Sequence, residues 1–225
     1  MPGLPAVAMM LVVSVATPVI AATATAVSSM PAATDTAPAV STQFTVDGFR
    51  SAKFGMTQDK VRAAIKADFN LSSEAIVAGT NAAERTQLLT ITVPDLLPGG
   101  GKAQVSYVFG YSSKALIQVG ISWSAAIDPT VDAAKLYADS DVLVAHFTSE
   151  GYVPATIRTG VVVDNGILLF RGEDSQGHTT ILLMQGQFSG GADSTQKVLK
   201  PTNLALLYAA DSKSPDIFKL DPGTF

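Results

Sequence analysis

The sequence predicts an α+β domain in which an antiparallel sheet of about six or seven strands is packed by two main helices. Three observations support this. Apolar residues recur at helical spacing in two segments, short apolar or alternating runs mark strands elsewhere, and the turns between those runs are too short for anything but antiparallel pairing. The predicted order is α-β-β-β-α-β-β-β, which divides the chain into two similar halves.

The first predicted helix begins after Thr57, whose hydroxyl can accept a hydrogen bond from an unpaired amide of the first turn. Apolar side chains then recur at helical spacing, and charged side chains take the other side, so one face of the helix should be buried. The buried face consists of Val61, Ala64, Ile65 and Phe69.

Three strands are predicted to follow this helix. Residues 71–85 show no clean period and are expected to form a short helix or turn and a loop. Residues 88–93 alternate as a strand does, and residues 105–109 and 115–123 form a hairpin around the turn at 111–114. Because the other side of these strands is polar or small, this half of the sheet should be covered on one face only.

The second predicted helix begins at Asp128, a carboxylate N-cap followed by Pro129 at the first helical position. It should run to about Phe147 or Ser149, since Gly151 supplies a left-handed stop.

The strands of the second half have a different pattern. Asn165-Gly166 predicts a two-residue turn with positive φ at both positions, which pairs residues 161–164 with 167–170. A second hairpin turns at 174–177 and returns along 179–184. These strands are apolar without alternation, so both of their faces should be covered.

Two explanations for that cover stay open. In one, the strands lie under the helices and the C-terminal segment packs over their back, with residues 203–210 as a further strand and 215–220 as extended chain. In the other, the back is a docking surface for a partner, and it includes Val162, Leu169 and Leu183.

The N-terminal segment predicts export. Leu4–Ala22 is apolar and uncharged, and small residues follow it at Ala22-Thr23-Ala24, as a signal peptidase requires. We expect a signal peptide at 1–26, an Ala/Ser/Thr/Pro spacer at 27–43 and a single α+β domain with an extended C-terminal tail at 44–225. The alternative is a leader retained as a membrane anchor. In both cases the body is periplasmic or secreted.

Composition excludes several classes of function. The formal charge is -4 and only 15% of residues are charged, so nothing favours nucleic-acid binding, which requires clustered Lys and Arg. The chain has no cysteine. Thiol nucleophiles, disulfides, zinc–thiolate sites, iron–sulfur clusters and lipidation through a cysteine are therefore ruled out.

Few residues suggest chemistry. Glu173, Asp174 and His178 lie close together in the sequence and could converge on a divalent cation, but they lack the regular oxygen-ligand spacing of a calcium loop. The alternative is a solvated polar turn. His146 lies within the second predicted helix, and the sequence offers no nucleophile for it to activate. Residues 99–102 lack the pattern of a phosphate-binding loop. The sequence predicts no catalytic residue and no cofactor.

The start of the first predicted helix is similar to that of two known families. FGMTQDKV, residues 54–61, resembles the helix start of the BamE (SmpA/OmlA) outer-membrane assembly family and of the beta-lactamase inhibitor protein family. Both families place that helix in front of a small antiparallel sheet. This chain lacks the lipobox cysteine of the first family and the disulfides of the second. FRSAKFGMT, LLFRGED and PDIFKLDPGTF are similar to segments of exported proteobacterial proteins of unknown function, which implies a compartment.

The expected function is a noncatalytic exported binding or assembly module that acts through protein–protein contacts with a partner in the cell envelope. It would touch a membrane only through an uncleaved leader. One alternative is a carrier of a small apolar ligand between sheet and helices, with Trp123, Tyr107 and Phe109 lining the cleft. Another is a hydrolase whose site is assembled around His178.

Overall fold

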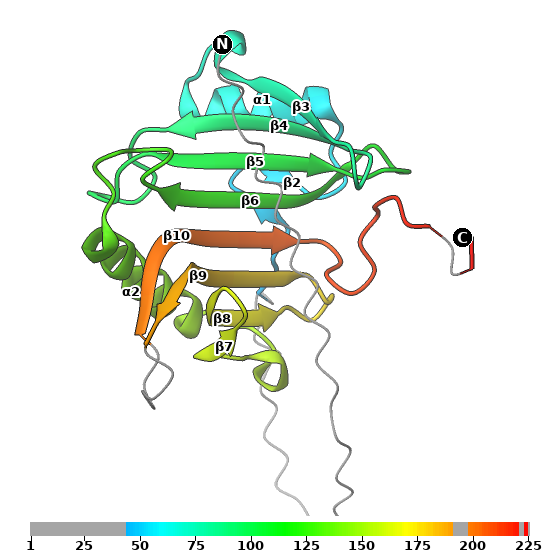
Figure 1. Ribbon diagram of the computed structural model, residues 1–225. Coiled ribbons are helices and arrows are strands. Elements are labelled where there is room, and N and C mark those ends of the chain that lie inside the picture. Colours follow the sequence, from blue (N-terminus) through cyan, green and yellow to red (C-terminus); the bar gives the residue numbers. More distant parts are fainter. Residues whose placement is uncertain (1–43, 191–197, 221–222, 225) are drawn as a thin grey trace, which may run out of the picture.

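The structure is a computed structural model that describes residues 44–190, 198–220 and 223–224. The predicted signal peptide and spacer lie outside these residues. The described chain is α+β, as predicted, with two α-helices, an eight-stranded antiparallel sheet and a two-stranded one (Figure 1). The helices are α1 (Gln58–Phe69) and α2 (Ala133–Ser149), with short 3₁₀ turns at Ser73–Ala75 and Pro154–Thr156.

In the large sheet the four strands of each half follow one another in chain order, from the outer edge to the centre. The strand order is β3-β4-β5-β6-β10-β9-β8-β7, so each half contributes four strands after its own helix, and the halves meet where β6 pairs antiparallel with β10. This confirms the predicted division into two similar halves. The strands are β3 (Val77–Asn81), β4 (Thr86–Val93), β5 (Ala103–Phe109), β6 (Leu116–Ser124), β7 (Val161–Val163), β8 (Gly166–Glu173), β9 (Thr179–Ser189) and β10 (Val198–Ala209).

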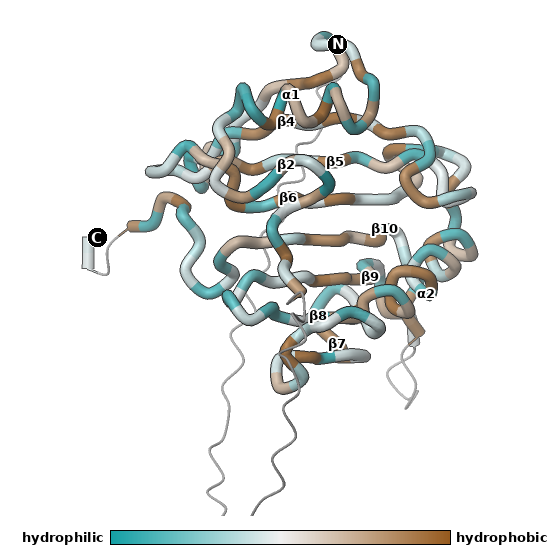
Figure 2. Tube along the Cα trace, turned by 180° about the vertical axis from the view of Figure 1, so that it is seen from behind, coloured by the Kyte–Doolittle hydropathy of each residue, from teal (hydrophilic) through white to brown (hydrophobic). Residues whose placement is uncertain are grey.

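Both helices lie on one face of the sheet, together with the small hairpin of β1 (Gly48–Phe49) and β2 (Ala52–Lys53) (Figure 2). The main core fills the space between this layer and the sheet. Among the described helices, none combines the length and the apolar composition needed to cross a bilayer. The helices contribute Val61, Ala64, Ile65, Leu136, Leu143 and Phe147 to the core, and the sheet contributes Leu89, Val105, Val119, Ile121, Trp123 and Leu204 among others.

A second apolar cluster explains why the strands of the second half are apolar on both faces. Leu168, Ile181 and Leu183 are buried on the face of the sheet away from the helices, packed with Val163 and Leu207. The prediction that residues 203–210 form a further strand is confirmed, because residues 203–209 belong to β10. This strand lies in the sheet itself, between β6 and β9, so it does not cover this face. The tail contacts the first half instead, through Phe218, so the expected cover by the C-terminal segment is wrong.

Three predicted boundaries need correction. The β7–β8 hairpin exists, but Val163 pairs with Gly166, so the two-residue turn is Asp164-Asn165, and neither has positive φ. Gly166 is needed for another reason, because a Cβ there would lie 2.1 Å from the carbonyl oxygen of Met184. Residues 77–81 form β3, whereas the sequence predicts a loop there.

The start of α2 is the third correction. The helix begins at Ala133, and Asp132 is its cap, accepting a hydrogen bond from the amide of Lys135. Asp128 has another role, because its carboxylate accepts hydrogen bonds from the amides of Lys102 and Thr130 and so closes the preceding loop. These hydrogen bonds lower the pKa of Asp128 to about 2.

Candidate functional site

A row of aromatic rings crosses from the first half of the molecule to the second on the helix side of the sheet. Phe49 in β1 stacks on Phe69 at the end of α1, with ring centroids 6.4 Å apart, and on Tyr208 of β10 at 5.9 Å. We call these three residues the aromatic row. Arg50 lies with its guanidinium 4.6 Å from the centroid of the Phe69 ring, at the first-half end of the row.

The β1–β2 hairpin fixes the middle of this row. Its turn at Arg50 has a left-handed φ of 52°, and the next residue, Ser51, donates to the carboxylate of Asp68 through both its amide and its hydroxyl, at 3.0 and 2.6 Å. Gly48 is required at the start of the hairpin. Its φ is 140°, and a Cβ would meet the carbonyl oxygen of Ala52 at 2.1 Å. The hairpin is therefore tied to the C-terminal end of α1.

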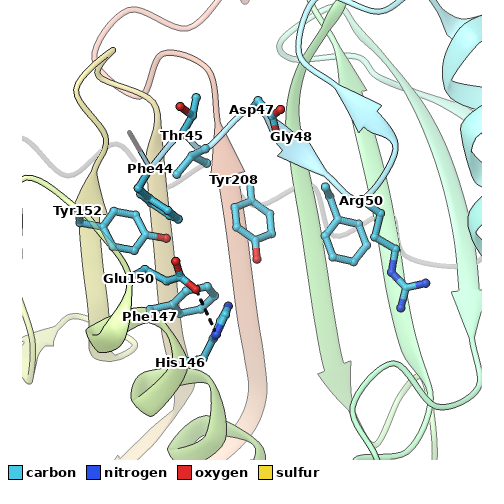
Figure 3. Close-up of a pocket in the computed structure, with 12 residues that line it drawn as sticks. Phe44, Thr45, Asp47, Gly48, Arg50, His146, Phe147, Glu150, Tyr152 and Tyr208 are labelled. Carbon is cyan, nitrogen blue, oxygen red and sulfur yellow. Dashed lines mark ion pairs between the residues drawn. The ribbon is translucent and has the colours of Figure 1, made fainter. Parts of the chain in front are cut away.

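Beside the row, at the C-terminal end of α2, lies a cleft with a volume of about 170 Å³ (Figure 3). The N-terminal segment that leads into β1 forms one of its walls, and the last turn of α2 and strand β10 form the others. Five aromatic side chains line it: Phe44, Phe49, Phe147, Tyr152 and Tyr208.

Four of the five lining rings pack edge to face, and Phe49 stacks on Tyr208. Phe44 meets Tyr152 at 4.6 Å between centroids and 63°, and Phe147 meets Tyr208 at 6.3 Å and 80°. These are favourable geometries for aromatic pairs. Gly151 allows the close approach of the N-terminal segment, because a Cβ there would lie 2.8 Å from the Cβ of Phe44.

The two tyrosine hydroxyls of the cleft differ. Tyr152 donates to the hydroxyl of Thr180 at 2.8 Å, and burial raises its pKa to about 12. The hydroxyl of Tyr208 points toward the end of the cleft where His146 and Glu150 lie (Figure 3). Burial raises the pKa of Tyr208 well above its usual value, and the nearby Tyr152 and Glu150 add to the effect.

Ionisable side chains lie at the rim of the cleft. His146 Nδ1 lies 3.5 Å from Glu150 Oε1, one helical turn apart, with 57% and 32% of the two side chains exposed. On the opposite wall Asp47 forms an ion pair with Lys53 at 2.8 Å. The sequence predicts only an ordinary helix histidine at position 146, and the structure places that side chain at the edge of the cleft.

The candidate metal ligands do not converge. Asp174 and His178 lie together, with His178 Nδ1 3.1 Å from Asp174 Oδ2, but Glu173 is held elsewhere by Arg171 at 2.6 Å and Lys213 at 3.0 Å. Burial alone would raise the pKa of Glu173, but these two cations outweigh it and lower the pKa. Within residues 44–190 and 198–220, no three acidic or histidine side chains are arranged to hold a metal ion.

The carboxylate of Asp174 serves as a structural clamp. Its Oδ1 accepts from the amides of Gln176 and His178, which closes the β8–β9 turn. Its Oδ2 accepts from the amide of Val46 at 2.8 Å, which fixes the N-terminal wall of the cleft. The ring of His178 packs edge-on against Phe54.

The three residues expected to form a docking surface do not share one face. Val162 lies on the edge strand β7, 67% exposed. Its partner across the ladder, Ile167, packs against the main core, and so does Leu169. Leu183 faces the other way, in the second cluster, and is 4% exposed. These residues therefore form no continuous surface.

The residues that do make a cleft are not predicted by sequence reasoning. The signal available is the pair of aromatic residues in FTVDGFR, residues 44–50, which precede the first helix without belonging to a helical or strand pattern. Tyr208 is predicted only as part of a strand. The aromatic residues suggested for a ligand cleft, Trp123, Tyr107 and Phe109, are instead core residues with at most 1% exposure.

Comparisons with known proteins identify no relative of this chain. Neither the protein-family models, nor the curated proteins, nor the solved structures against which the chain was compared give a match. The resemblance of residues 54–61 to two families stays a prediction.

Proposed function

We propose that this protein is a noncatalytic exported module that binds another protein of the cell envelope, with the cleft between α2, β1 and β10 receiving one side chain of that partner. The observation that carries the proposal is a small open cleft with five aromatic walls beside the junction of the two halves. Protein interfaces concentrate their binding energy in a few anchor side chains that fill such pockets.

The size of the cleft favours a side chain over a complete ligand. Pockets that enclose drug-sized ligands measure roughly 300 to 1,000 Å³, whereas this cleft measures about 170 Å³. Between the sheet and the helices lie the buried side chains of the main core. This argues against the alternative of a carrier that holds a small apolar ligand there.

The polar groups that could suggest a hydrolase are also engaged. Asp174 uses both carboxylate oxygens in four hydrogen-bond contacts that hold a turn and the N-terminal segment. A carboxylate that orients a catalytic histidine would need that histidine to face a nucleophile. His178 instead rests against the ring of Phe54.

Site-specific photo-crosslinking in the native host tests the proposal. A photoreactive amino acid at position 146, beside the cleft, should give one discrete adduct with an envelope protein. The same residue at position 77 on β3, where Val77 is 61% exposed, is the control and should not give that adduct. The substitution Tyr208→Ala should abolish the adduct while the circular dichroism spectrum is unchanged.

Two results would overturn the proposal. One is the same adduct from both positions, because contact would then not depend on the cleft. The other is an adduct from position 146 that survives Tyr208→Ala in a folded protein, because an anchor pocket cannot work without its wall.

A further inference from the structure

We infer that the anchor received by the cleft is an organic cation, namely the ammonium or guanidinium group of a partner's Lys or Arg side chain. The inference rests on the proposed function, because it names the chemistry of the partner at the same site. Three features carry it: the aromatic walls, the cation already bound at one end of the aromatic row, and the carboxylate at the other end.

The walls present the right chemistry. Aromatic rings carry negative charge on their faces, and several rings around one space attract a cation that has shed its water. Phe147 meets Tyr152 and Tyr208 at nearly perpendicular angles beside the cleft, whereas Phe49 is stacked on Phe69 and Tyr208. A pocket for an apolar group could be lined equally well by Leu, Ile and Val. In this cleft Val46 is the only lining residue of these three types.

The protein already uses this contact at the other end of the row. The guanidinium of Arg50 lies 4.6 Å from the ring centroid of Phe69 and 5.8 Å from that of Phe49. At the Tyr208 end, no Lys or Arg of the described chain stacks on Tyr208, Phe147 or Tyr152, although these three rings line the cleft (Figure 3).

The charges around the cleft favour a cation at that end. Asp47 is neutralised by Lys53 at 2.8 Å, and Arg50 is held over Phe69 and hydrogen-bonded to the carbonyl oxygen of Asp68. Among the described residues, Glu150 forms an ion pair only with His146, at 3.5 Å, with both side chains partly in solvent. Two carboxylates line the cleft, Asp47 and Glu150, and Glu150 has the weaker partner, because His146 is farther away than Lys53 is from Asp47 and carries a charge only when protonated. Glu150 lies at the end of the cleft toward which the Tyr208 hydroxyl points (Figure 3).

A matched pair of small probes tests the charge preference directly. Choline and its neutral isostere 3,3-dimethylbutan-1-ol have nearly the same shape, so only the charge differs. We expect chemical-shift changes at Tyr208 and Phe147 on titration with choline, and an affinity about 2- to 30-fold higher than for the isostere, the range that cation–π contacts give. A short peptide with a single Arg should likewise bind better than the same peptide with norleucine.

The carboxylate of Glu150, which follows the last residue of α2, is tested against a matched carboxylate on that helix. Glu150→Gln should reduce choline affinity several-fold, whereas Asp141→Asn, an exposed carboxylate elsewhere on α2, should leave it unchanged. Equal binding of choline and the neutral isostere, or no effect of Glu150→Gln, would overturn the inference that the anchor is a cation. Neither result would affect the crosslinking test of the proposed function. Choline binding without binding of the Arg peptide would overturn the assignment to a protein side chain.

Discussion

The amide of Val46 donates a hydrogen bond of 2.8 Å to Oδ2 of Asp174, which joins residues 128 positions apart in the chain. The carboxylate also closes the β8–β9 turn, so one side chain fixes both the start of the described chain and a hairpin of the second half. The cleft depends on this contact, because Phe44 and Phe49 lie on either side of Val46 and form part of its lining.

Removing this clamp should destabilise the protein. In Asp174→Ala, the amides of Val46, Gln176 and His178 lose their acceptor in a buried site. Hydrogen bonds to charged groups contribute about 1.5–3 kcal/mol each, with partial compensation by water, so we expect the free energy of unfolding to fall by about 3 kcal/mol. Urea denaturation measures this. Asp164→Ala, at an exposed turn position, is the control and should change it by less than about 0.5 kcal/mol.

The hairpin that carries Phe49 should depend on Gly48. An alanine there would adopt an unfavourable φ of 140° and place its Cβ 2.1 Å from the carbonyl oxygen of Ala52. Gly55 offers a matched control, because its φ is also positive, at 83°, but nothing lies within 4 Å of the added Cβ. We expect Gly55→Ala to cost about 1–2 kcal/mol of unfolding free energy and Gly48→Ala clearly more. Equal losses would show that the hairpin shifts to relieve the contact.

A buried carboxylate in α2 should make stability depend on pH. Asp139 is 6% exposed, and its Oδ2 has no hydrogen-bond partner in the described structure. Burial raises its pKa; Lys135 opposes this shift and Asp95 adds to it. Because the folded-state pKa lies above the unfolded value of 3.8, this residue's contribution is most favourable below pH 3.8 and is lost as the pH rises through the folded-state pKa.

Replacing that carboxylate should therefore stabilise the protein at neutral pH. We expect Asp139→Asn to raise the free energy of unfolding at pH 7 by about 1 kcal/mol and to make it less dependent on pH between about 4 and 7. Urea denaturation across that range measures the effect, with Asp141→Asn as the exposed control. A loss of stability in Asp139→Asn would show that the charged form is required.

The C-terminal tail should detach in acid. Asp216 accepts hydrogen bonds from the amides of Ser112 and Ser113 at 2.9 and 2.8 Å. The side chain and amide of Ser113, with a smaller effect from Ser112, lower the pKa of Asp216. The stabilisation is present above the ordinary value of 3.8 and is lost as the pH falls through the lowered pKa. The amide of Phe218, bonded to the carbonyl oxygen of Glu84, reports this in hydrogen exchange.

A variant separates the carboxylate from general acid effects on the tail. Asp216→Ala should expose the Phe218 amide to fast exchange at pH 7, whereas Lys219→Ala should not, because Lys219 is exposed and lies outside these contacts. Slow exchange of Phe218 in Asp216→Ala would mean that the remaining contacts hold the tail, namely those of the Phe218 ring with Arg85 and Tyr111 and the hydrogen bond from the Tyr111 amide to the carbonyl oxygen of Asp216.

The fold was predictable where buried residues recur in the sequence at the spacing of a helix or a strand. Val61, Ala64 and Ile65 do face the core, and the α+β class is confirmed. Strand β3 was missed because four of its five residues are exposed, so its sequence, VAGTN, carries no alternation. The start of α2 was misplaced because Asp128 and Asp132 are both residues that can cap a helix. Asp132 caps it, whereas Asp128 accepts hydrogen bonds from the amides of Thr130 and the distant Lys102.

The candidate site was less predictable than the fold. The cleft is made by residues far apart in the chain, such as Phe49 and Tyr208, and the sequence around neither of them has a motif that predicts a binding site. The proximity of Asp174 and His178 could be expected, because Asp174 begins the predicted turn at 174–177 and His178 follows it. The hydrogen bond between Asp174 and the amide of Val46 could not be expected, because it depends on where the N-terminal segment crosses the second half.

The position of β10 sets a condition on how the molecule can be assembled. This strand is the last of the eight in chain order, yet it lies between β6 and β9 in the sheet. Until it is inserted, each half ends in a strand with unsatisfied backbone groups, which can pair with other chains. A polypeptide truncated before Val198 would therefore be aggregation-prone, and adding residues 198–209 as a separate peptide should restore a soluble, continuous sheet.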